Sequence, residues 1–210
     1  MKTFKKVVAT ALIASMALSA TGCGALKFKA TDAKTFKKAL EKANDGMSEA
    51  MDDFDDEWGY GFSDDYTCYY VEVDDADEIE DYYDAEGAEK FYMAMTQEDE
   101  DDEEGVIYYF IEFEDEESAR DYFNEEYYED FVEAKDDKDI EGDFKSNLGK
   151  TSGYIIIDAE SSSKDIGKGQ VTGGIYLADN TVVVVLAFDA SKSAKKEITA
   201  FLEAIEYPFL

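Results

Sequence analysis

Apolar residues recur along the first part of the chain with two different spacings, and each spacing predicts a different element. From Thr31 onward they recur every three or four residues, which places them on one stripe of an α-helix. The stripe comprises Phe36, Ala39, Leu40, Ala43, Met47, Ala50, Met51 and Phe54. In residues 67–73 apolar and polar positions alternate, as in a β-strand with one buried face. We therefore expect a long helix followed by a strand.

The middle of the chain predicts a hairpin and a second helix. Residues 91–96 and 106–114 are expected to be strands joined by the acidic turn 97–105. Asp115 is a suitable helix cap, because its carboxylate can accept hydrogen bonds from the free N–H groups of the first turn. The buried stripe of this helix would be Ala119, Phe123, Tyr127, Phe131 and Ala134. Residues 76–90 fit either a helical turn or an irregular loop.

The C-terminal part follows the same order of elements. Residues 154–158, 170–177 and 181–189 are predicted strands, the last two joined by a tight turn, and residues 194–206 form a helix. The run VVVVLAF is apolar on both faces, which is typical of a central strand. The pattern predicts an α+β fold, an antiparallel sheet with helices packed on it. Because strand, hairpin and helix occur twice in this order, a duplicated unit is a further hypothesis.

The N-terminus has the features of an export signal. Three lysines precede the apolar run of residues 7–18, and small residues lead up to Cys23. The run is too short for a permanent membrane span, which needs about 20 residues in a helix. The sequence Ala20-Thr21-Gly22 before Cys23 resembles the bacterial lipoprotein pattern, although Ala20 replaces the usual leucine. The alternative is an ordinary signal peptide followed by an incidental cysteine.

The lipoprotein resemblance implies a division of the chain. Residues 1–22 would be removed as the signal peptide, Cys23 would carry the lipid, and residues 23–30 would form a tether. Residues 31–210 would then be a single acidic domain, since the chain has one proline and no Pro/Ser-rich linker. The protein would be held on the extracytoplasmic face of the cell membrane. Once Cys23 is acylated, Cys68 has no partner for a disulfide within the chain, and its place in an alternating strand predicts a buried thiol.

Charge excludes one class of partner. The chain has 52 acidic and 20 basic residues, a formal net charge of -32. A surface this acidic repels phosphate backbones, so nucleic acid is not expected as a partner. Residues 27–42 are an exception, with six lysines close to the proposed anchor. They fit equally well a contact with anionic lipid headgroups and a solvated basic helix face.

The same composition restricts the possible chemistry. The chain has no histidine, which excludes serine triads with histidine and zinc sites of the HExxH kind. Seven consecutive acids at residues 98–104 suggest a weak cation site, with Asp99, Asp101 and Glu103 as candidate ligands. The run fails as an EF-hand because Ile111 occupies the place of the bidentate glutamate. A solvated hairpin tip is the favoured interpretation, and no cofactor is predicted.

Tyrosines occur in tandem pairs beside acidic residues. The pairs are Tyr69-Tyr70, Tyr82-Tyr83, Tyr108-Tyr109 and Tyr127-Tyr128. Aromatic faces flanked by carboxylates can bind sugars, and paired carboxylates can hydrolyse them. Acids are so abundant here that some pair meets any spacing, and alternate residues of a strand face opposite sides. We therefore expect half of each tandem pair in the core, and no catalytic residue is predicted.

Several stretches resemble a loosely defined group of uncharacterised surface lipoproteins of Gram-positive bacteria. The resemblance is carried by ATDAKTFKKALEKA (30–43), YYFIEFEDEESARDYFNE (108–125), YLADNTVVVVLAF (176–188) and EITAFLEAIEYP (197–208). It implies a membrane-anchored domain of unassigned activity. The sequence thus favours a non-enzymatic lipoprotein with a binding or structural role toward a protein or glycan partner. The alternative is an extracytoplasmic module that binds cations or glycans.

Overall fold

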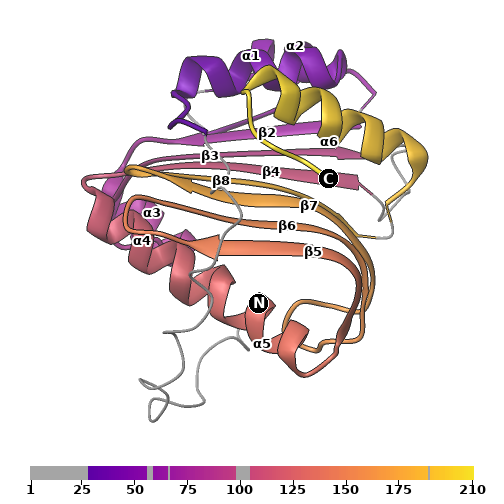
Figure 1. Ribbon diagram of the computed structural model, residues 1–210. Helices are drawn as coiled ribbons and strands as arrows, with labels where there is room; N and C mark the ends of the chain where they lie inside the picture. Colours follow the sequence, from indigo (N-terminus) through magenta and orange to yellow (C-terminus); the bar gives the residue numbers. More distant parts are fainter. Residues whose placement is uncertain (1–27, 56–58, 66, 98–104, 189) are drawn as a thin grey trace.

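The computed structural model describes residues 28–55, 59–65, 67–97, 105–188 and 190–210. Within these residues eight strands form one antiparallel sheet in the order β1-β2-β3-β4-β8-β7-β6-β5 (Figure 1). The strands are β1 (Tyr60–Phe62), β2 (Cys68–Val73), β3 (Ala88–Gln97), β4 (Gly105–Phe113), β5 (Ile140–Leu148), β6 (Ser152–Ser161), β7 (Gly169–Ala178) and β8 (Thr181–Phe188). The predicted α+β class, an antiparallel sheet with helices packed on it, is confirmed.

Helices cover both faces of the sheet. They are α1 (Ala33–Ala43), α2 (Gly46–Asp52), α3 (Ala76–Tyr83), α4 (Glu116–Phe123), the π-helical turn η1 (Asn124–Tyr128), α5 (Glu129–Asp136) and α6 (Lys192–Ala204). One face carries α1, α2 and α6, and the other carries α3, α4 and α5 (Figure 1). Residues 181–187 of β8 are therefore buried on both sides, as predicted for a central strand.

The first predicted helix is divided in two. Asp32 caps α1 and accepts a hydrogen bond from the Thr35 N–H, so the start is close to the predicted Thr31. Asn44 is extended (φ -145°) and its Oδ1 accepts the N–H of Gly46 at 3.0 Å, which ends α1 before α2 begins. The prediction of one continuous helix was wrong. The whole apolar stripe nevertheless packs on the core, because both helices lie on the same face.

The segment after β4 forms the second predicted helix. The Asp115 carboxylate accepts hydrogen bonds from the N–H groups of Glu117 and Ser118, which confirms the predicted cap. The helix continues through η1 into α5, and the Glu129 N–H bonds to the Asn124 carbonyl five residues earlier. This wider turn keeps both ends of the predicted stripe buried against the sheet. The ambiguous residues 76–90 contain α3, a loop with Asp84 at φ +54°, and the start of β3.

The pattern missed strands β1 and β5. β1 has only three residues, and β5 is an edge strand whose side chains are mostly exposed, so neither gives a clear alternation. The predicted strand-to-helix order does occur in both halves. Because β4 and β8 are adjacent and antiparallel, a twofold rotation that exchanges the two halves has its axis perpendicular to the sheet. Such a rotation would leave equivalent helices on the same face of the sheet. The helix after β4 and the helix after β8 lie on opposite faces, so the recurring order is not a symmetric repeat.

Candidate functional site

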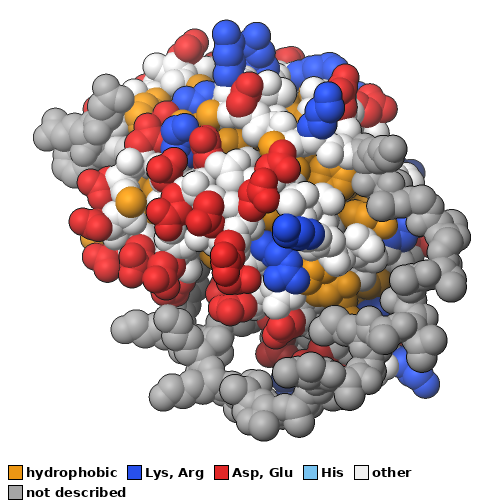
Figure 2. All heavy atoms as spheres, turned by 60° about the vertical axis from the view of Figure 1, so that its left-hand side comes forward, with side chains coloured by type: hydrophobic (Ala, Val, Ile, Leu, Met, Phe, Trp, Pro, Cys, Tyr) orange, Lys and Arg blue, Asp and Glu red, His pale blue; other side chains and the backbone are white. Residues whose placement is uncertain are grey.

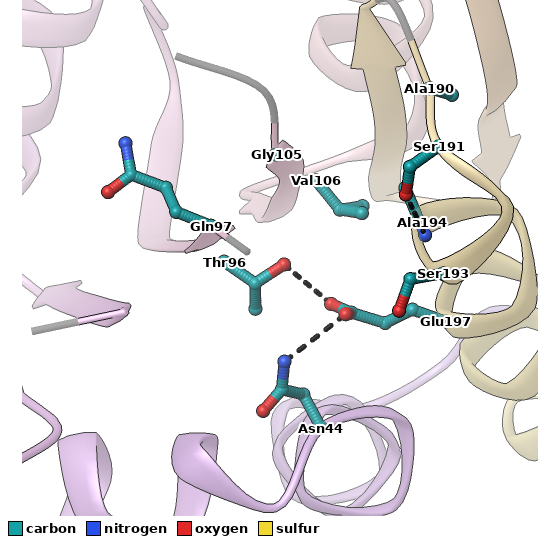
Figure 3. A pocket seen from close by; sticks show the side chains of 10 residues that line it. All are labelled: Asn44, Thr96, Gln97, Gly105, Val106, Ala190, Ser191, Ser193, Ala194 and Glu197. Carbon is teal, nitrogen blue, oxygen red and sulfur yellow. Dashed lines mark hydrogen bonds between the residues drawn. The ribbon is translucent and has the colours of Figure 1, made fainter. Parts of the chain in front are cut away.

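A pocket of about 400 Å³ lies where β3 ends and β4 begins, against the start of α6 (Figure 3). Its walls come from β3, β4, α6 and the connection between α1 and α2. The polar lining residues are Asn44, Thr96, Gln97, Ser191, Ser193 and Glu197. The volume is within the range of small-molecule sites, and polar groups from distant parts of the chain converge on it.

Glu197 is the ionisable group among the described residues that line this pocket. The buried stripe of α6 includes Ala194, Ile198 and Phe201, and Glu197 lies beside it, three residues after the first and four before the last. This position places its side chain at the border between the packed face and solvent, where the residue is half-buried. The carboxylate therefore reaches the ends of β3 and β4.

Neutral donors from three elements hold the Glu197 carboxylate. Its Oε1 accepts hydrogen bonds from the Thr96 hydroxyl and the Tyr108 hydroxyl, each at 2.6 Å. Its Oε2 accepts one from the Asn44 Nδ2 at 3.2 Å, and Figure 3 shows Thr96 and Asn44 directed at the two oxygens. A carboxylate oxygen has two lone pairs, so Oε2 retains an acceptor position next to the pocket.

The donors are themselves fixed. Burial, and then the negative charge of Glu197, raise the pKa of Tyr108 well above its ordinary value, so the phenol remains a donor. The Asn44 Oδ1 accepts the Gly46 N–H at 3.0 Å and the Cys68 thiol at 3.5 Å, which orients the amide. Cys68 is fully buried, as predicted, and burial raises its pKa to about 11. Its thiol therefore stays neutral and unreactive near neutral pH.

The described lining residues provide one carboxylate, that of Glu197, with neutral neighbours. Across the described part of the chain, no group of three or more Cys, Asp or Glu side chains could hold a metal ion. What the pocket offers a ligand is a carboxylate acceptor with amide and hydroxyl groups around it.

None of the site residues singled out from the sequence is among the described residues. Cys23 and the weak cation candidates Asp99, Asp101 and Glu103 are outside the described residues, so those assignments stay predictions. Gln97 and Gly105, which flank the acidic run, do line the pocket. Sequence reasoning missed Glu197. Its position beside the apolar stripe of a helix was the available signal, but the donors that make it a site come from Asn44, Thr96 and Tyr108, far away in the chain.

Two of the four tandem tyrosine pairs place one member in the core as expected, whereas in Tyr82-Tyr83 and Tyr127-Tyr128 neither member is fully buried. In β2 and β4 one member of each pair is buried, namely Tyr70 and Tyr108, and the other faces the opposite side half-buried. Tyr82 is exposed, and its neighbour Tyr83 stacks on Phe91. The half-buried members Tyr69 and Tyr83 line a second hollow at the sheet edge. The pairs thus divide between core and surface rather than forming one aromatic site.

Comparison with models of known protein families gave no match. No curated protein and no solved structure matches the chain either. Within the described ranges, no helix combines the length and the apolar character that crossing a membrane requires.

Proposed function

We propose that the protein is a lipid-anchored binding protein on the extracytoplasmic face of the membrane, without enzymatic activity. The sequence around Cys23 supports the anchor, and the resemblance to surface lipoproteins agrees with it. The pocket at Glu197 supports the binding role. The observation that carries this role is the Glu197 carboxylate, whose Oε2 keeps an acceptor position and which lines a pocket of about 400 Å³ together with polar side chains from three segments.

The pocket favours a small ligand that donates hydrogen bonds. No Lys or Arg pairs with Glu197 among the described residues. Its carboxylate is held there by neutral hydrogen-bond donors, without a positive charge beside it. An amine or amide N–H can complete the coordination of Oε2, and charge-assisted hydrogen bonds of this kind are stronger than neutral ones. Ser193 and Gln97 offer further polar contacts.

Two experiments test the two parts of the proposal separately. The substitution Cys23→Ser should move the protein from the membrane pellet to the soluble extracellular fraction. An unchanged pellet fraction contradicts the lipid anchor, whatever the pocket binds.

For the pocket, acetamide, ethanolamine and glycerol are titrated while NMR signals of Asn44, Thr96 and Val106 are followed. We expect shifts with the two nitrogen donors, and their loss in Glu197→Gln. Glu203→Gln is the matched control, because Glu203 lies exposed on the same helix away from the pocket. Equal responses of the two variants contradict the ligand role of Glu197.

Cation or glycan binding is the second candidate function. Aromatic rings and carboxylates meet at the hollow lined by Tyr69 and Tyr83, which favours it. Calcium at the acidic run 98–104 belongs to the same alternative and is tested by calorimetric titration, where the absence of heat at millimolar calcium rules that site out.

A further inference from the structure

A second pocket, of about 330 Å³, lies at the outer edge of the sheet. Strand β1 pairs residues 60–62 with residues 69–71 of β2, and the Glu72 N–H donates to the Gly59 carbonyl, so the described pairing on that side of β2 ends at Glu72. Tyr60 and Tyr69 form one wall of the hollow, and Tyr83 from the end of α3 forms another. The pocket shares no lining residue with the one at Glu197.

The three tyrosine rings are held by other aromatic side chains. The Tyr60 and Tyr69 ring centroids are 6.4 Å apart, and both rings pack against Phe62, at 5.5 and 5.0 Å. Tyr83 stacks on Phe91 with centroids 3.9 Å apart. Tyr60 is still 38% exposed, and Tyr69 and Tyr83 are half-buried. The pocket therefore presents fixed aromatic surface to solvent instead of burying it in the core.

Carboxylates surround these rings. Glu72 lines the pocket, but its carboxylate is bound by the Lys37 ammonium and the Tyr70 hydroxyl. Asp74, Asp75 and Glu78 also line it, all three are exposed, and none forms an ion pair with a described Lys or Arg. Asp75 also caps α3 with one oxygen. Figure 2 shows acidic side chains crowded over the side of the molecule that carries α3 and α4.

We propose that this pocket binds a small organic ammonium ion. The face of an aromatic ring attracts a cation, and a carboxylate beside it supplies the counter-charge. The acidic surface raises the local concentration of cations around the opening. An inorganic cation fits less well, because the described carboxylates do not converge into a group that could hold a metal ion. This inference rests on the second candidate function, at the same hollow, and is independent of the anchor and of the Glu197 pocket, so its failure leaves both of those standing.

Choline and its neutral isostere 3,3-dimethylbutan-1-ol provide the decisive comparison, since they differ in charge and hardly in shape. Calorimetric titration of the full-length lipoprotein in detergent should show choline binding at least about tenfold tighter than the alcohol. Choline binding should also weaken as NaCl is raised, because salt screens exposed charges. Equal binding of the two compounds, or binding of neither, overturns the proposal.

Variants then locate the site. Tyr60→Leu should weaken choline binding about three- to tenfold, whereas Tyr60→Phe keeps the ring and should leave binding nearly unchanged. Glu78→Gln should weaken it more than Glu80→Gln, which removes the same charge from an exposed position on α3 outside the pocket. Equal effects of the two charge variants overturn the assignment of choline to this pocket, because they indicate that choline responds only to the overall negative charge of the protein. Tight binding of a neutral oligosaccharide that depends on Tyr60 but not on Glu78 assigns the pocket to sugars instead.

Discussion

Glu197 is the residue on which three segments of the fold meet. Its side chain receives one donor from the connection between α1 and α2, one from β3 and one from β4. The same carboxylate thus stabilises the packing of α6 and offers an acceptor to the pocket. A structural role predicts that a substitution of Glu197 lowers the free energy of unfolding, and a binding role predicts that it weakens ligand binding. Measurements of stability and of binding therefore separate the two roles.

We expect Glu197→Ala to lower the free energy of unfolding by about 2–4 kcal/mol, because the Thr96, Tyr108 and Asn44 donors lose a charged partner. Glu197→Gln should cost less, since the amide oxygen can still accept from Thr96 and Tyr108. Urea denaturation measures both values, with Glu203→Ala as the exposed control on the same helix. A cost for Glu197→Ala no larger than that of the control contradicts the structural role.

At the scale of elements, α6 is tied to the sheet by a second polar contact. The Lys195 Nζ lies 2.8 Å from the Asp158 Oδ1 of β6, and Thr172 and Gln170 donate to the same oxygen. Burial raises the pKa of Asp158, but the bonds from Lys195, Thr172 and Gln170 outweigh it and leave the pKa below its ordinary value. The ionised carboxylate is therefore favoured in the folded protein.

Lys195→Met should destabilise the protein by about 0.5 kcal/mol at pH 7, a small value because both partners are partly exposed. The sign of the pH dependence follows from the lowered pKa of Asp158: the contribution is present above the unfolded value of 3.8 and is lost as the pH falls through the folded value. The difference between wild type and variant should therefore shrink as the pH falls below the unfolded value of 3.8. Thermal unfolding measured from pH 7 to pH 3 tests this, and a difference that grows in acid contradicts it.

Helix boundaries also belong to this scale. The apolar stripe from Phe36 to Phe54 was visible in the sequence, but the break at Asn44 was not. Asn44 leaves the helix because its side chain bonds to Gly46, Cys68 and Glu197, and two of these partners are distant in sequence. The strands β1 and β5 were missed for a related reason, since only their neighbours in the sheet define them.

At the scale of the whole molecule, the most prominent feature is the large excess of negative charge. The formal net charge is -32, and Figure 2 shows acidic side chains crowded on the side that carries α3 and α4, with basic ones at the top, where α1 lies, and in the middle of the face. Like charges this numerous repel one another and oppose the compact state. Screening of that repulsion by salt should therefore stabilise the fold.

We expect the unfolding temperature to rise between 10 mM and 500 mM NaCl. Calcium and magnesium chloride, compared at equal ionic strength, should then give equal further increases, because we predict a solvated acidic turn rather than a calcium site. A larger effect of calcium that disappears in the combined variant Asp99→Asn, Asp101→Asn, Glu103→Gln contradicts that prediction and identifies those residues as ligands.

The sequence by itself determined the elements with strong periodicity, the α+β class, the central place of β8, the cap at Asp115 and the burial of Cys68. These follow from local rules, since alternation and helical spacing already specify which side chains must leave water. Tertiary structure alone decided that the helices cover opposite faces, that α1 stops at Asn44, and that Glu197 meets Thr96, Tyr108 and Asn44. The physical reason is that hydrogen bonds between distant segments, unlike apolar stripes, leave no periodic trace in the chain.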